Sequence, residues 1–153
     1  MKKISMNSVL NILAAVLLAV SLIVIEVSFQ TAQGWFDTNK NPLLMVLAVG
    51  GILLLAAVTA LNILGTGGEN KVISVAKTVC SAGACACAGV VFGLVLGAIA
   101  TEFAYTFFSD FNKGTVKEYF MPQACTQAIA GMVLAVVAMI AAIAANGFEP
   151  RKS

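Results

Sequence analysis

Hydrophobic residues fall into four long runs that are separated by short polar stretches. A membrane-spanning helix needs about 20 apolar residues, because each residue rises about 1.5 Å and the hydrocarbon core is about 30 Å thick. The runs show no strand-like alternation, so they predict helices rather than a transmembrane barrel. We therefore expect an all-α, four-helix transmembrane bundle that forms a single membrane domain over residues 1–153. Its predicted spans are residues 9–29, 43–64, 78–101 with an extension to about 108, and 124–145.

Composition supports this prediction. Apolar residues make up 60% of the 153-residue chain and charged residues only 10%, against about 45–50% and about 25% in soluble domains. The low charge and the long uncharged runs exclude a basic nucleic-acid-binding module and a disordered tail protein, so the lipid bilayer is the expected surroundings. The start Met1-Lys2-Lys3 before an apolar run is also compatible with a secretory signal, but the run is long and its cleavage pattern poor. A retained first helix is expected.

The positions of Lys and Arg predict the orientation, because loops on the cytoplasmic side carry more of them. Six lie on the side of the two termini and three on the other. This distribution places both termini in the cytoplasm, and short loops with a Lys-Lys start favour a bacterial inner membrane. The first group is Lys2, Lys3, Lys71, Lys77, Arg151 and Lys152, and the second is Lys40, Lys113 and Lys117.

The outer side carries a second feature, an excess of aromatic residues. A capping box at Thr115 to Glu118 predicts a short interfacial helix over about residues 116–121, which Pro122 limits. The aromatic side chains predict an interfacial anchor or a platform for an apolar ligand, a lipid or a partner protein. They are Phe29, Trp35, Phe36, Phe103, Tyr105, Phe107, Phe108, Phe111, Tyr119 and Phe120.

Small residues recur at regular spacing in the third and fourth spans, which is typical of closely packed membrane helices. They are predicted to form helix-packing surfaces. Two interpretations remain open for the third span: packing against its neighbours in the same chain, which we favour, or a homodimer contact. The residues are Ser81, Cys85, Gly89, Gly93 and Gly97 in the third span and Gly131, Ala135, Ala138 and Ala142 in the fourth.

Ionisable and amide side chains inside membrane spans are the usual candidates for function, because they are costly in lipid. Glu26, Glu102 and Asn11 are the candidates for a proton, cation or substrate site. The alternative interpretation, which we favour, is that both glutamates reach the outer interface and are hydrated or paired with Lys40, Lys113 or Lys117. For the first span, the line of Ser8, Asn11, Ala15, Ala19 and Glu26 is expected to face the bundle interior.

Signatures of catalysis do not occur in the sequence. The chain has no histidine, and three of its four cysteines lie in one span, where their spacing is unsuited to a disulfide or a thiolate metal site. We therefore expect no enzyme activity, no metal and no cofactor. Two functions remain: an accessory or assembly subunit that binds another membrane protein or a second copy of itself, or a small transporter or channel that uses Glu26 and Glu102.

Overall fold

Four helices account for nearly all of the described structure, a computed structural model in which residues 6–31, 40–64, 71–108 and 122–147 are described. They are α1 (Met6–Thr31), α3 (Leu43–Leu64), α4 (Lys71–Phe108) and α6 (Pro122–Gly147). Each contains a stretch long and apolar enough to cross a bilayer. The prediction of an all-α, four-span membrane bundle is therefore confirmed. Helix α4 begins at Lys71, earlier than the expected residue 78.

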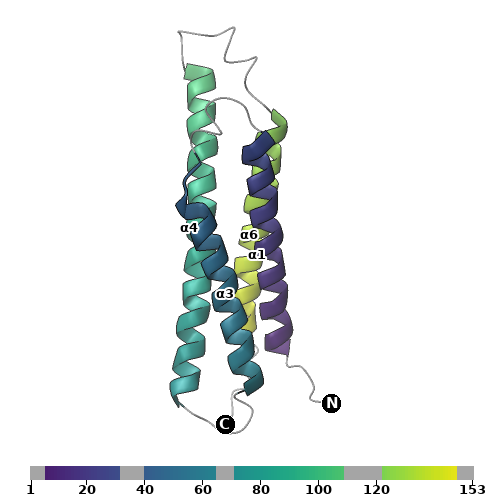
Figure 1. Ribbon diagram of the computed structural model, residues 1–153, viewed down its shortest axis with the longest axis vertical. Coiled ribbons are helices and arrows are strands. Elements are labelled where there is room, and N and C mark those ends of the chain that lie inside the picture. Colours follow the sequence, from purple (N-terminus) through teal and green to yellow (C-terminus); the bar gives the residue numbers. More distant parts are fainter. Residues whose placement is uncertain (1–5, 32–39, 65–70, 109–121, 148–153) are drawn as a thin grey trace.

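The helices run alternately up and down, and each packs against two of the others (Figure 1). The order around the bundle is α1, α3, α4 and α6, with α6 returning to pack on α1. Met6 and Gly147 lie at the same end, which we call the Met6 end, and Thr31 lies at the opposite Thr31 end. Helix α4 is the longest and extends beyond the others at the Thr31 end (Figure 1).

Helix α3 begins with a well-formed cap. The Asn41 side-chain oxygen accepts a hydrogen bond of 2.9 Å from the Leu43 N–H, and the Asn41 carbonyl accepts one of 3.0 Å from the Leu44 N–H. These bonds satisfy amide groups that the first turn of a helix leaves without partners. The cap also fixes where Lys40, the preceding residue, meets the bundle.

Buried positions follow the same rule in every helix, recurring at steps of three or four residues. The mean spacing of about 3.5 residues keeps these positions on one side of a helix and lets them interdigitate with the neighbours. The series runs through residues 7, 11, 14, 18, 21, 25 and 28 of α1; 44, 48, 51, 55 and 58 of α3; 81, 84, 88, 91, 95, 98 and 102 of α4; and 125, 128, 132, 135, 138, 142 and 145 of α6.

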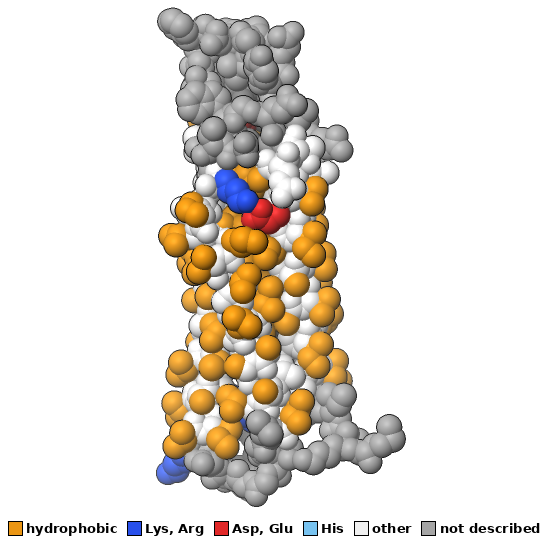
Figure 2. Space-filling model, viewed as in Figure 1, with side chains coloured by type: hydrophobic (Ala, Val, Ile, Leu, Met, Phe, Trp, Pro, Cys, Tyr) orange, Lys and Arg blue, Asp and Glu red, His pale blue; other side chains and the backbone are white. Residues whose placement is uncertain are grey.

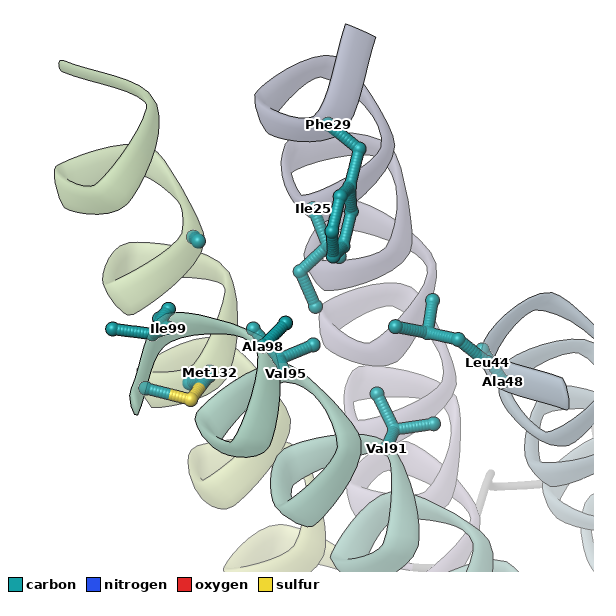
Figure 3. Packing of buried hydrophobic residues seen from close by; sticks show 10 residues of the cluster. Ile25, Phe29, Leu44, Ala48, Val91, Val95, Ala98, Ile99 and Met132 are labelled. Carbon is teal, nitrogen blue, oxygen red and sulfur yellow. The ribbon is translucent and has the colours of Figure 1, made fainter. Parts of the chain in front are cut away.

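Apolar side chains fill the middle of the bundle. Near the Thr31 end, Ile25 and Phe29 of α1 point toward the space bounded by Val91 and Val95 of α4 (Figure 3). A second cluster around Leu18, with many alanines, continues the core toward the Met6 end. Because lipid is as apolar as these side chains, the bundle gains its stability from close packing and not from removing apolar surface from water.

Candidate functional site

The small residues of α6 lie inside the bundle, against α1. Ala135, Ala138 and Ala142 are at most 2% exposed. At Gly131 the helices approach so closely that an added Cβ would lie 2.5 Å from Cγ1 of Ile25 and 3.3 Å from the backbone oxygen of Ser21. The Ser21 hydroxyl donates a hydrogen bond of 2.7 Å to the Gly131 carbonyl. The glycine thus permits α1 and α6 to approach each other closely at this point.

The small residues of α4 are divided between the core and the surface. Ser81 is buried and Cys85 is half-buried. In contrast, an added Cβ at Gly89, Gly93 or Gly97 would meet nothing within 4 Å. The favoured interpretation, packing within the chain, is therefore wrong for these three glycines. The reason is geometric: steps of four residues advance about 400°, so the stripe rotates by about 40° per step out of an interface that follows a 3.5-residue spacing.

The outward side of α4 consequently carries an unusual surface, which we call the α4 face. Small residues dominate it, with Val90 and Leu96 also exposed along the same stretch of helix. The Thr101 hydroxyl donates to the Gly97 carbonyl at 2.8 Å, within the same helix. The α4 face comprises Ala82, Ala86, Gly89, Gly93, Gly97, Ala100, Thr101 and Ala104.

The exposed sides of α1 and α6 differ from the α4 face. Between residues 9 and 27, every exposed position of α1 is a valine, isoleucine or leucine, and α6 exposes mainly valine and isoleucine. Such branched side chains cover the backbone and suit contact with lipid tails. Among the described parts of α1, α4 and α6, α4 alone combines a long exposed side with backbone that a neighbouring helix can approach closely.

Glu26 forms an ion pair with Lys40, one of its three expected partners. The side chains are 15% and 34% exposed, respectively. On the side seen in Figure 2, a basic and an acidic side chain touch near the upper limit of the hydrophobic band, and another basic side chain lies at its lower limit. The pair joins α1 to the residue that precedes the α3 cap. It also supplies Glu26 with a neutralising charge at the edge of the membrane span.

Glu102 lies inside the bundle. Its exposed fraction is only 6%, and it occupies a position in the buried series of α4. The expectation of a hydrated carboxylate is therefore wrong for Glu102, because the 3.5-residue spacing turns this position inward near the Thr31 end. The other expected state, a pair with Lys113 or Lys117, involves lysines that lie outside the described residues. A buried group of this kind is compatible with either a structural or a functional role.

Asn11 belongs to an amide cluster near the Met6 end. Its side-chain nitrogen donates to the Asn7 side-chain oxygen at 2.6 Å, and the Asn62 nitrogen of α3 donates to the same oxygen at 2.9 Å. Asn11 itself is fully buried. Asn11 and Glu26 are fifteen positions apart in one helix, a rise of about 22 Å. The structure therefore places Asn11 at one end and both glutamates toward the other, so the three candidates do not form one site.

Sequence reasoning missed part of the polar interior of α1. Ser21 and Ser28 are fully buried, whereas Ala15 and Ala19 are only half-buried and Glu26 lies at the edge of the interior. Of the line predicted to face inward, Ser8 and Asn11 are buried as expected, and the other three members are turned partly out of the interior. A seven-residue recurrence of small or polar residues was the available signal, because such a recurrence marks a bundle interior. It runs through Asn7, Ala14, Ser21 and Ser28.

Of the ten aromatic residues predicted to form an outer anchor or platform, only Phe29 and Phe103 have described side chains. Phe29 is 1% exposed and belongs to the core, so its assignment to an outer surface is wrong. Phe103 is exposed on α4. The interfacial helix at 116–121 lies outside the described residues. So do Trp35, Phe36, Phe111, Tyr119 and Phe120, and also the side chains of Tyr105, Phe107 and Phe108.

Within the described residues, no group of three or more His, Cys, Asp and Glu side chains gathers as a metal site would require. No protein-family model matches the chain, and neither a curated protein nor a solved structure matches it. The most distinctive features of the described structure are therefore the outward α4 face, the buried carboxylate and the amide cluster.

Proposed function

We propose that the protein is an accessory or assembly subunit that binds a transmembrane helix of another membrane protein, or of a second copy, on the α4 face. The supporting observation is that Gly89, Gly93 and Gly97 face outward with open space beyond them. Glycine lowers helix propensity by about 1 kcal/mol relative to alanine, and these three positions give no packing within the chain in return. Small residues at four-residue spacing let two membrane helices come close enough for extensive backbone contact.

The chemistry of the face indicates the kind of partner. It carries no charged side chain, and its one hydroxyl, that of Thr101, is bonded within its own helix. An apolar helix that carries small side chains at the point where the two helices cross would fit such a surface. A second copy and a different protein are the two sources of that helix, and the mass of a cross-linked product distinguishes them.

For location and orientation, we propose a bacterial inner membrane with the Met6 end in the cytoplasm. The support is the distribution of Lys and Arg, six on the terminal side and three on the other. In this orientation the amide cluster lies near the cytoplasmic interface, and the Glu26 and Lys40 pair lies near the outer one.

A photo-cross-linking experiment tests this function directly. A benzoyl-phenylalanine residue at Ala86 or Ala100, both exposed on the α4 face, should yield a discrete cross-linked protein in native membranes. The same residue at Val16, exposed on α1, should yield mainly lipid adducts. Equal protein cross-linking from both helices, or none from α4, would contradict the proposal. A product at twice the mass of the chain would identify a second copy as the partner.

The Glu26→Gln variant separates this function from that of a transporter. Because Lys40 is partly exposed and can reach water, losing its partner should change the free energy of unfolding by less than about 1 kcal/mol. We expect cross-linking from α4 to persist in membranes that carry this variant. A folded Glu26→Gln or Glu102→Gln protein that loses a measurable ion or solute flux would favour the transporter instead.

A further inference from the structure

The bundle is built from two closely packed helix pairs. Contacts between α1 and α6 and between α3 and α4 are more extensive than those between α1 and α3 or between α4 and α6. Each close pair also contains a glycine at its contact. Gly131 of α6 lies against Ile25 of α1, and an added Cβ at Gly83 of α4 would lie 3.1 Å from Cδ1 of Leu54 in α3. Gly51 of α3 lies between two neighbours, since an added Cβ there would lie 2.9 Å from Cδ2 of Leu18 in α1 and 3.2 Å from Cβ of Cys87 in α4.

The two looser seams are joined by side-chain amides. Asn62 of α3 donates to Asn7 of α1 at 2.9 Å, across the first seam. Asn146 of α6 donates to the hydroxyl of Ser81 in α4 at 2.8 Å, across the second. Asn62 and Asn146 both lie within the last turn of their helices, at the Met6 end. In the described part of the chain, each looser seam thus has one amide bond at this end.

Asn11 lies beside the first of these bonds, and its side-chain nitrogen donates to the Asn7 side-chain oxygen. The Asn11 side-chain oxygen is fully buried and accepts no hydrogen bond within the described structure. A buried acceptor without a donor disfavours the state that contains it. Separation of α1 from α3 at this end would let water donate to that oxygen, so the unpaired acceptor favours opening while the two amide bonds oppose it.

We propose that the protein is a two-part device, in which the α1/α6 and α3/α4 pairs move as rigid bodies and separate at the Met6 end when the Asn7–Asn62 and Ser81–Asn146 bonds break. The closely packed pairs keep their internal contacts during this motion, because a fixed glycine contact leaves little freedom to slide. The Thr31 end, where large side chains such as Phe29 and Ile25 fill the core, acts as the hinge.

Distances between pairs of spin labels, measured in lipid nanodiscs, test whether the two helix pairs separate at the Met6 end. The labels are attached at Val9, Ile63, Val75 and Ile143, which are exposed on the four helices. Each label is carried by a ketone-bearing amino acid, so the four native cysteines stay in place. In the double variant Asn62→Leu/Asn146→Leu, the distance distributions Val9–Ile63 and Val75–Ile143 should widen by about a factor of two. The distributions Val9–Ile143 and Ile63–Val75, within the pairs, should stay unchanged.

Two further variants make the test specific. Thr59→Val/Thr78→Val removes one hydroxyl bond from α3 and one from α4, but each bond is made within its own helix, so no distribution should change. Asn11→Leu removes the unpaired acceptor and leaves Asn62 bonded to Asn7, so the distributions across the seams should narrow. Equal widening within and across pairs, or no widening, would overturn the proposal. If the double variant does not fold, the same distances are measured in the wild-type protein as it is warmed. The proposal then requires the distance distributions across the seams to widen and those within the pairs to stay unchanged.

Discussion

Replacing Gly131 with alanine is expected to lower the free energy of unfolding by about 1–3 kcal/mol, the usual cost of forcing extra volume into a packed interior. The new methyl group would lie 2.5 Å from Cγ1 of Ile25, a branched side chain that cannot rotate away cheaply. It would also lie 3.3 Å from the Ser21 carbonyl, which belongs to the backbone. Helix α6 must therefore move away from α1 and stretch the Ser21 hydrogen bond. Reversible unfolding in mixed micelles measures the loss.

Gly93→Ala is the matched control for this prediction, because it makes the same chemical change in another membrane helix. An added Cβ at Gly93 meets nothing within 4 Å. The substitution should be neutral or should stabilise the monomer by up to about 1 kcal/mol through helix propensity. Equal destabilisation by the two substitutions would show that the position of the glycine in the bundle is irrelevant, contrary to the packing described above.

A second substitution identifies the clash itself. In Gly131→Ala/Ile25→Ala, the side chain that the new methyl group meets is gone, so the double variant should be more stable than the sum of the two single changes implies. Additive losses would place the cost of Gly131→Ala elsewhere than at Ile25.

The four membrane spans were predictable from the sequence. The side of each helix that faces the bundle interior was only partly predictable. Lipid imposes length and hydrophobicity on a helix, so four runs were sufficient to identify α1, α3, α4 and α6. The number of residues between successive small residues decided whether such a series stays in an interface or reaches the surface. From Gly131 to Ala142 the steps are four, three and four residues, and this series stays in the interface. From Ser81 to Gly97 every step is four, and the series rotates out to the surface.

Polar contacts were harder to anticipate. Lys40 was one of three candidate partners for Glu26, and only the course of the chain into the α3 cap makes it the partner. The bond between Asn62 and Asn7 joins residues that are 55 positions apart and depends on the lateral order of the helices. Periodicity within one helix carries no information about that order, so sequence patterns could nominate Asn11 but not its partners.

Replacing Gly93 with leucine should leave the monomer folded and weaken its association through the α4 face by about tenfold or more, which corresponds to about 1.4 kcal/mol or more. The side chain would stand in the middle of the face, with Gly89 and Gly97 one turn away on either side. Its Cβ would meet no described atom within 4 Å, so the unfolding free energy of the monomer should not fall. Toward a partner it acts as a wedge that separates the two backbones. Energy transfer between labelled chains, or capture of the cross-linked partner, measures the association.

Gly50→Leu provides the control that separates association from a general effect of leucine on a membrane surface. Gly50 is also a helical glycine with open space beyond its Cα, but it belongs to α3 and lies outside the α4 face. Both substitutions add the same side chain, raise hydrophobicity equally and replace a residue of low helix propensity. Only Gly93→Leu should reduce association, because dispersion contacts between backbones weaken rapidly as the helices move apart. If Gly50→Leu reduced association equally, the α4 face would not be the binding surface. If neither did, the outward glycines would be in contact with lipid alone.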